Sequence, residues 1–269
     1  MTARLYLSAL SLEIRKLISY RVEFWIRIFL SVIIHVTIAY FIWSALFFYN
    51  GVTEMKGYSF LGIVLYSLLA PVIANIIRAH DNGNIAQDIY EGTLTRYLIY
   101  PISFLGMKFV QHSALSIFFL FQLFLVSVVF WIGFGIPSDV NLSFFTLFQC
   151  IVICVFASVV HFLIASFLEQ VAFWADNVWS LNVALRFTVH FLGGVMIPLS
   201  FFPDWALSII KFTPFPYLIY LPVQTLLGKS NTHDWAVGIL VLTFWLAALT
   251  FMNKAIWKRG TRIYTGVGI

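Results

Sequence analysis

The stretch AQDIYEGTLTRYLIYPI, from Ala86 to Ile102, places two acids, an arginine, a glycine and a proline between long apolar runs. Around it, the 269-residue chain is 61% hydrophobic and 10% charged, with a mean hydropathy of +0.94. A soluble domain has about a quarter of its residues charged, so this chain has too few charges to cover a surface in water. The composition therefore predicts an all-α membrane protein in which this stretch connects two membrane-spanning helices.

Six apolar runs are long enough for a bilayer-spanning helix, which needs about 20 residues. A length of 269 residues would ordinarily suggest one or two domains. For a membrane protein the useful unit is the spanning helix, and we treat residues 1–269 as a single transmembrane domain. We expect the six spans at Phe24–Tyr49, Tyr58–Ile77, Leu105–Phe134, Phe144–Phe167, Ser180–Ile197 and Trp235–Ile256.

Lysine and arginine predict the orientation of these spans. They gather before the first span, between the second and third, and after the sixth, and basic loops are typical of the cytoplasmic side. We therefore expect both termini in the cytoplasm, although the connector from Glu169 to Asp176 departs from the pattern because it carries only acids. Before the first span, leucines and isoleucines recur at helical spacing among charges. This pattern favours an interfacial helix over residues 1–22, with a cytoplasmic extension of the first span as the alternative.

The quoted stretch lies within a cytoplasmic segment that we place at residues 78–104. Ile85 and Ile89, four residues apart, predict one apolar edge of a short helix that Gly92 ends in a left-handed conformation. A second short helix follows, until Pro101 forces an extended backbone. The result would be a compact knob with aromatic side chains and charges of both signs, suited to docking in a partner's groove. An ordinary solvated loop is the alternative.

The segment over residues 198–232 is apolar but is interrupted by five prolines, so no single helix can run through it. We expect re-entrant half-helices on the outer side, near Asp204–Lys211 and Tyr217–Leu227. Pro203, Asp204 and Trp205 are typical of a helix start, because an acid there faces the positive end of the helix dipole. An amphipathic loop resting on the outer surface is the alternative.

A few ionisable residues lie within or close to the predicted spans, where charges are costly and are candidates for function. They are His161, Glu169, Asp176, Arg186 and His190. Structural roles are favoured for the histidines, and Arg186 is expected to reach the inner headgroups or to pair with Asp176. A lipid-modifying membrane enzyme would use His161, Glu169 and Asp176, and an ion- or proton-coupled carrier is a further alternative. The sequence has neither a Gly-x-Ser-x-Gly turn nor a His-Glu-x-x-His zinc motif.

Three motifs carry a resemblance to a known family. They are IYEGTLTRYLIYPI at 89–102, IPLSFFPDW at 197–205 and WKRGTRIYTGVG at 257–268. In this order and spacing they resemble permease subunits of ABC transporters of type 2, an exporter-like family, and the tail is similar to a bacterial six-span subgroup in which two different permeases are often paired.

The resemblance implies a machine of two permeases, different or identical, and two ATPase subunits. The chain has no Gly-x-x-x-x-Gly-Lys-Ser/Thr loop, so ATP and Mg²⁺ would bind the ATPase partners, with no cofactor and no catalytic or metal site on this chain. The machine would export an amphipathic, drug-like, lipid-like or glycan-linked substrate across the bacterial inner membrane by alternating access. Membrane lipid would be a further partner, and no nucleic-acid partner is expected.

The resemblance also assigns residues to two elements of the family. The coupling helix, which would press into an ATPase groove, takes Ile85, Asp88, Ile89, Tyr90, Glu91, Gly92, Thr93, Leu94, Arg96 and Pro101. The outer half-helices take Pro198, Pro203, Asp204, Trp205 and Pro214.

Overall fold

The computed structural model describes residues 2–19, 21–79, 84–99, 102–135, 137–141 and 143–266. In chain order these form α1 (Thr2–Ser19), α2 (Arg21–Asn50), β1 (Glu54–Met55), β2 (Tyr58–Ser59), α3 (Phe60–Arg78), α4 (Asn84–Tyr90), α5 (Leu94–Leu98), α6 (Phe104–Phe134), α7 (Phe144–Glu169), the 3₁₀ helix η1 (Gln170–Phe173), α8 (Trp179–Leu192), η2 (Leu199–Phe201), α9 (Asp204–Ile210), α10 (Phe215–Leu218), α11 (Tyr220–Leu226) and α12 (Thr232–Ile263).

The prediction of an all-α membrane protein is confirmed. Within the described residues, five helices are long and apolar enough to cross a membrane: α2, α3, α6, α7 and α12. The pair formed by α9 and the α10–α11 segment is bent by 80° and would make a sixth crossing if it counts as one span. At 1.5 Å per residue, the 31 residues of α6 and the 32 of α12 extend about 45–50 Å, beyond a hydrocarbon core of about 30 Å.

The predicted fifth span, 180–197, is wrong in its extent. Helix α8 has 14 residues and ends at Leu192, which makes it about 21 Å long. Gly193 and Gly194 follow, and Gly194 has a φ of +81°, a left-handed backbone that interrupts the helix. Pro198 then immediately precedes η2. The residues after Leu192 are still mostly apolar, but the helix ends before them.

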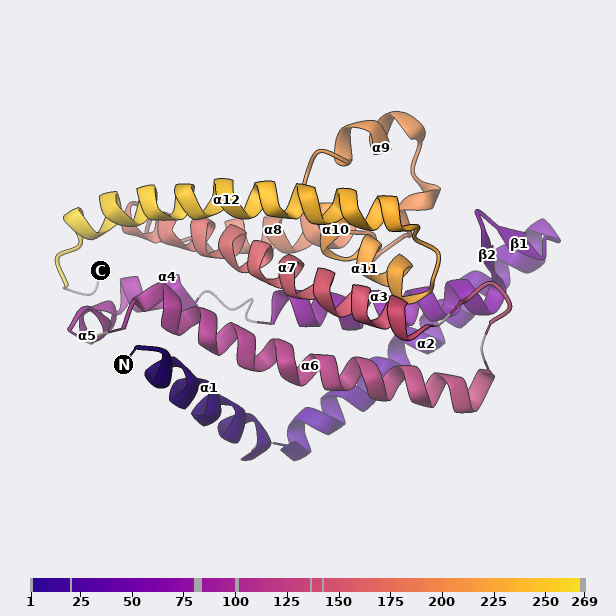
Figure 1. Ribbon diagram of the computed structural model, residues 1–269, viewed down its shortest axis with the longest axis horizontal. Helices are drawn as coiled ribbons and strands as arrows, with labels where there is room; N and C mark the ends of the chain where they lie inside the picture. Colours follow the sequence, from indigo (N-terminus) through magenta and orange to yellow (C-terminus); the bar gives the residue numbers. More distant parts are fainter. Residues whose placement is uncertain are drawn as a thin grey trace.

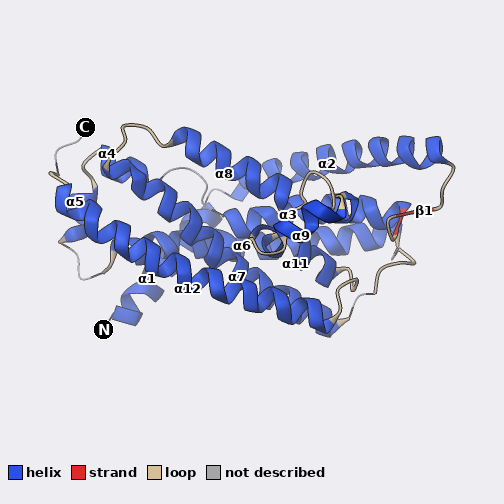
Figure 2. Cartoon of the chain, turned by 90° about the horizontal axis from the view of Figure 1, so that it is seen from above, coloured by secondary structure: helices blue, strands red, loops and turns tan. Residues whose placement is uncertain are grey.

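Helices α3 and α7 form the centre of the bundle. Helix α3 packs against α2, α6 and α7, while α7 also packs against α11 and α12. In the apolar window of α3, 72% of the residues are buried, against 11% in α2, which extends along one side of the molecule in Figure 2. Helix α2 therefore presents most of its apolar surface to lipid or to another membrane protein.

Polar residues begin several of the long helices. The Ser59 and Ser103 hydroxyls accept from the backbone N–H groups of Gly62 and Gly106 at 3.0 and 3.1 Å, and the side-chain oxygen of Asn231 accepts from the N–H of Asp234 at 2.7 Å. Each bond satisfies a donor that the first turn leaves without a partner. Short polar residues at the ends of apolar runs therefore determine where α3, α6 and α12 start.

The two ends of the molecule carry different secondary-structure elements. The start of α1, helices α4 and α5 and the end of α12 lie at one end, and β1 and β2 lie at the other (Figure 1). Helix α1 is separate from α2 and packs along α6, where the Tyr6 hydroxyl lies 3.2 Å from Ser103 Oγ and Gln111 Nε2 donates to Glu13 Oε1 at 3.2 Å. We call the end with α4 and α5 the coupling end, after the coupling helix that the family resemblance implies there, and the end with β1 and β2 the hairpin end.

Candidate functional site

At the coupling end, α4 packs its apolar edge into the protein. Ile85, Ala86 and Ile89 are buried, and they form a small hydrophobic cluster that is separate from the main core. Its other buried members come from α5, α6, η1 and the residue before α8: Leu94, Phe104, Ala172, Phe173 and Val178. The apolar edge predicted for α4 therefore exists, but it is already covered by this chain.

Aromatic rings extend this cluster to the C-terminal part of the chain. Trp257 of α12 stacks on Phe104 with ring centroids 5.4 Å apart and meets Phe173 edge-on at 5.8 Å. Tyr264, just after α12, lies 6.1 Å from the Phe173 ring. Such ring pairs add about 0.5–1.5 kcal/mol each beyond area burial. The segments that follow α3, α7 and α12 thus meet in one packed body.

Two hydrogen bonds fasten α4 to the end of α7 and the segment after it. The backbone N–H of Ile85 donates to Glu169 Oε2 at 2.8 Å, in a buried contact. At the other end of α4, the Tyr90 hydroxyl donates to the carbonyl of Ala175 at 3.0 Å. Burial raises the pKa of Tyr90 above its ordinary value, so the phenol stays protonated and remains a donor.

An ion pair fastens α4 to α6. Asp88 Oδ2 lies 2.5 Å from Lys108 Nζ, and both side chains are largely buried. The Thr93 hydroxyl donates to Asp88 Oδ1 at 2.6 Å. The Lys108 ammonium also lies 5.6 Å from the centre of the Tyr97 ring, a favourable cation–π arrangement. Asp88, predicted as a docking residue, is therefore neutralised within the chain.

Gly92 ends α4 as predicted. It adopts a φ of +72°, a left-handed backbone that costs a residue with a Cβ about 1–2 kcal/mol. The chain then turns into α5, whose buried residue is Leu94.

The exposed face of the two short helices is small and mixed in chemistry. Glu91 is exposed, and its Oε1 accepts from Gln87 Nε2 at 2.7 Å. Arg96 is exposed on α5, and Leu98 and Ile99 are 52% and 79% exposed. Pro101, also predicted as a docking residue, lies outside the described residues.

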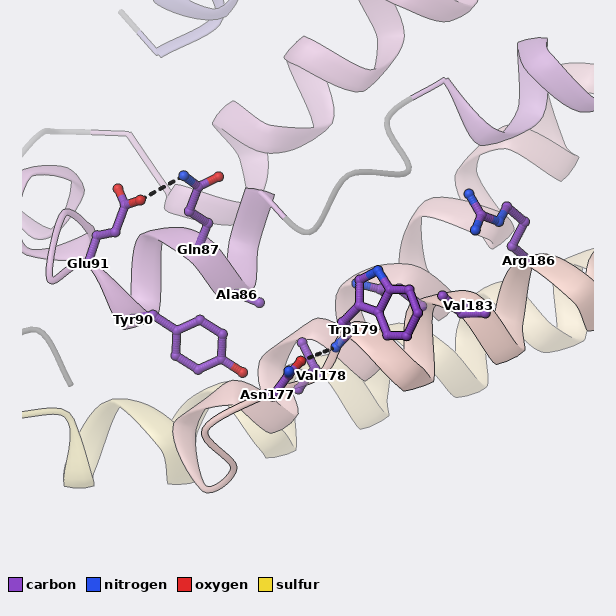
Figure 3. A pocket seen from close by; sticks show the side chains of 10 residues that line it. Ala86, Gln87, Tyr90, Glu91, Asn177, Val178, Trp179, Val183 and Arg186 are labelled. Atoms are coloured by element: carbon purple, nitrogen blue, oxygen red, sulfur yellow. Dashed lines mark hydrogen bonds between the residues drawn. The ribbon is translucent and has the colours of Figure 1, made fainter.

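A groove of about 410 Å³ separates α4 from the start of α8. In Figure 3, Gln87 and Glu91 lie on the α4 side, Trp179 and Arg186 lie along α8, and the Tyr90 ring extends from α4 toward the segment before α8. Trp179 is 69% exposed. The groove therefore brings an acid, an arginine and a large ring together at the surface.

The predicted intramembrane polar residues fall into two groups. Glu169 is the last residue of α7, and Asp176 is exposed in the segment before α8, so both belong to the coupling end. Arg186 is exposed on α8 and forms no ion pair with Asp176 within the described part of the chain.

His112 and His161 are buried inside the bundle, and His190 is partly buried. His112 Nε2 lies 2.8 Å from Ser158 Oγ, and the Arg78 guanidinium contacts the ring of His190 at 2.9 Å. His161 is 1% exposed, and in the described part of the chain neither of its ring nitrogens has a hydrogen-bond partner.

Short helices occur in both ranges where half-helices were predicted: α9 lies within 204–211, and 217–227 holds the end of α10 and all of α11, separated at Ile219. Pro203 precedes α9, Asp204 is its first residue, and Pro214 precedes α10. Trp205 is 71% exposed. Helix α11 is buried from Leu221 to Leu226 and packs against α3, α7 and α12, so its backbone is surrounded by protein.

A cavity that sequence reasoning missed lies beside residues 198–232, which we call the outer segment after the position predicted for them. It measures about 1160 Å³ and is bounded by α2, α3, the end of α8 and α9. Its lining is mainly apolar, and it includes Trp43, Phe201 and Trp205 together with His35 and His190. Hydropathy alone carries no signal for it, because the same side chains would serve equally well against lipid.

The contacts of Lys108, Glu169 and Trp257 were missed for a similar reason. Their partners lie far away in sequence, and no spacing rule connects them. The connector from Glu169 to Asp176 departed from the charge pattern because it carries only acids. The contacts of Glu169 at the coupling end account in part for this departure.

Residues 29–268 match the family described as ABC-2 family transporter protein. No curated protein and no solved structure matches the chain. The match covers most of the chain, including α4, α5, the outer segment and α12, and it agrees with the resemblance carried by the three motifs. The chain belongs to the ABC-2 transporter family and is a permease, the transmembrane component of an ABC transporter, whose family partners are ABC ATPase subunits.

Proposed function

We propose that this permease exports an amphipathic substrate and that its coupling end docks on an ATPase subunit. The observation that carries the proposal is the anchoring of α4. Its apolar edge is buried in a cluster with the segment after α7, and Trp257 and Tyr264 pack against that cluster. In contrast, Glu91, Arg96, Leu98 and Ile99 remain exposed. A rigidly held knob with exposed charges and apolar side chains can receive force from a partner without deforming.

The roles of the predicted docking residues divide accordingly. The exposed residues named above, together with Gln87, would contact the ATPase. The buried residues Ile85, Ile89 and Leu94 would instead set the position of α4 and α5. Asp88 and Thr93 serve the same purpose through their contacts with Lys108 and with each other.

The mechanism follows from differential affinity. ATP and Mg²⁺ bind the ATPase pair, its closure displaces α4, and the permease pair changes from inward-open to outward-open. Hydrolysis then resets the cycle. Each step shifts the equilibrium only as far as ATP or substrate prefers one state over the other.

The apolar cavity supports an amphipathic substrate, because its lining offers aromatic and aliphatic contacts with a few polar groups. A second permease, different or identical, would cover the exposed apolar face of α2 and close this cavity from lipid. Drug-like, lipid-like and glycan-linked molecules all fit this chemistry.

We place the protein in a bacterial inner membrane with both termini in the cytoplasm. The basic residues near the coupling end support this orientation. Helix α1 would lie in the inner interface, since Leu7 and Leu12 are each 65% exposed among charged residues. The α9–α11 segment would enter the bilayer from outside as a re-entrant loop.

Purification in mild detergent tests the docking proposal. A soluble ATPase should copurify in stoichiometric amount, and Glu91→Lys should reduce the copurified ATPase about tenfold or more, as expected for a lost interfacial charge contact. ATP hydrolysis by the complex in vesicles of phosphatidylethanolamine and phosphatidylglycerol should fall in parallel, while the amount of permease in the membrane is unchanged.

Glu54→Lys is the matched control, because it reverses an exposed acid at the hairpin end. This variant should retain the ATPase and its activity. Full ATPase recovery and full hydrolysis in the Glu91 variant would contradict the proposed contact, and ATP-independent turnover by the isolated chain would favour an enzyme instead.

A further inference from the structure

We propose that Glu169 is the positioning residue that transmits the displacement of α4 to α7. This inference rests on the proposed docking of an ATPase at α4. It addresses a different question, namely which helix of the bundle moves first when α4 is displaced. The chain itself connects α4 to α3 on one side and through α5 to α6 on the other, yet the contacts of α4 indicate another route.

Helix α4 packs against η1 and α7. At its start, Glu169 is 5% exposed and accepts the backbone N–H of Ile85 at 2.8 Å. A hydrogen bond from a backbone N–H to a buried carboxylate is about twice as strong as one between neutral groups. Because the donor is a main-chain atom, the bond links the helix itself, rather than a mobile side chain, to the last residue of α7.

Two further contacts also join α4 to the segment that follows α7. Tyr90, the last residue of α4, donates to the carbonyl of Ala175 at 3.0 Å. Ile85 and Ile89 pack beside Ala172 and Phe173 of η1 in the small cluster. Both ends of α4 and its apolar edge are therefore held by the segment that begins at Glu169, so α4 and the end of α7 are expected to move as one body.

Helix α7 is well placed to carry such a movement. Over its 26 residues it packs against α3, α11 and α12, and it extends from the coupling end to the hairpin end (Figure 1). A displacement of Glu169 along α7 would reach α11 and the outer segment directly, since packed helices shift as rigid elements.

The ion pair between Asp88 and Lys108 offers a competing route through α6. The two routes make different predictions. If α7 carries the movement, then removing the Glu169 carboxylate weakens the response at the far end of α7 while the Asp88–Lys108 pair remains intact.

The experiment uses the permease with its copurified ATPase and a reporter cysteine at Phe144, the first residue of α7, which is 87% exposed. Cys150→Ser and Cys154→Ser remove the two native cysteines, both buried and free. The rate of reaction with a membrane-impermeant maleimide is measured with and without ATP and Mg²⁺. In the parent protein we expect the labelling rates with and without ATP to differ by about fivefold or more, the typical size of an allosteric coupling. In Glu169→Ala we expect the two rates to become nearly equal.

Glu169→Gln is the matched variant, because its amide oxygen still accepts from the N–H of Ile85. It should restore much of the ATP response, whereas a purely structural role for the site would appear as loss of folded protein in both variants. Glu169→Asp, which withdraws the carboxylate by one methylene group, should give an intermediate response and tests the proposal if Glu169→Ala does not fold.

An ATP response in Glu169→Ala equal to that of the parent would overturn the inference, and so would a Gln variant as unresponsive as the Ala variant. A parent complex whose residue 144 ignores ATP would also overturn it. These outcomes differ from a failure of the proposed docking, in which no ATPase copurifies with the parent protein at all.

Discussion

Lys229 joins separate segments of the chain at the hairpin end. Its ammonium lies 2.5 Å from Asp139 Oδ2 and donates to the carbonyl of Gly57 at 2.7 Å. The Ser59 N–H donates to the same carboxylate at 3.2 Å. Burial alone would raise the pKa of Asp139, but the hydrogen bonds from Lys229 and Ser59 outweigh it and hold the pKa below the ordinary value of 3.8. The carboxylate therefore stabilises the fold in its charged form.

Lys229→Met should lower the free energy of unfolding in detergent by about 1–3 kcal/mol, because it leaves a largely buried carboxylate without its ammonium partner. Thermal unfolding at neutral pH measures the loss. Lys211→Met, at an exposed lysine of the outer segment, is the control and should change little. Equal stability of the Lys229 variant and the parent would contradict this role of the ion pair.

The same pair predicts a pH dependence. A carboxyl group whose pKa is lowered on folding contributes stability above its unfolded pKa, and the contribution is lost as pH falls through the folded value. The parent should therefore lose the contribution of Asp139 below about pH 4. In Asp139→Asn this loss should be absent, so acidification should narrow the difference in melting temperature between the two proteins.

At the scale of elements, α12 reaches the coupling end through a close approach. Gly260 is buried against Phe173, and a Cβ at this position would overlap the phenylalanine ring. The approach allows Trp257, one turn earlier, to stack on Phe104. The absence of a side chain at residue 260 thus lets the end of α12 join the body that holds α4.

Gly260→Ala should reduce the free energy of unfolding by about 1–3 kcal/mol, because the added methyl group overpacks this contact. Gly133→Ala is the matched control, since residue 133 lies on α6 with open space around it. The control should leave stability unchanged or raise it by up to about 1 kcal/mol through helix propensity. Thermal unfolding of both variants tests this prediction. Equal melting temperatures would show that α12 can shift to accommodate the methyl group without loss of stability.

Several of the elements could be predicted from sequence. Pro203 and Asp204 begin α9, Gly92 ends α4, and the long apolar helices α2, α3, α6, α7 and α12 lie close to the predicted spans. These features depend on residues within one or two turns of each other, so local rules suffice. Helix α8 was predicted too long because its apolar composition continues past Gly194, where the backbone turns.

For the whole molecule, α4 and α5 lie at the opposite end from the β1–β2 hairpin (Figure 1), so the proposed orientation predicts that these two ends face opposite compartments. Single cysteines at Arg96 and Lys56, in a chain with Cys150→Ser and Cys154→Ser, test the orientation. In intact cells, an impermeant maleimide should label only the cysteine at residue 56. The cysteine at residue 96 should react only after permeabilisation, because its side chain is exposed and the proposed orientation places it in the cytoplasm. The reverse pattern would show that the chain is inverted.

The sequence by itself determined that this chain lies in a membrane, where its long helices run, and that a polar knob interrupts them after the second apolar run. Composition and hydropathy determine these features because the bilayer imposes the same requirement on every span. The tertiary structure alone decided that Glu169 binds the backbone of α4, that Lys108 neutralises Asp88, and that an apolar cavity lies beside α9. These contacts join residues far apart in sequence, and they depend on the relative shift and rotation of packed helices, which an apolar pattern does not specify.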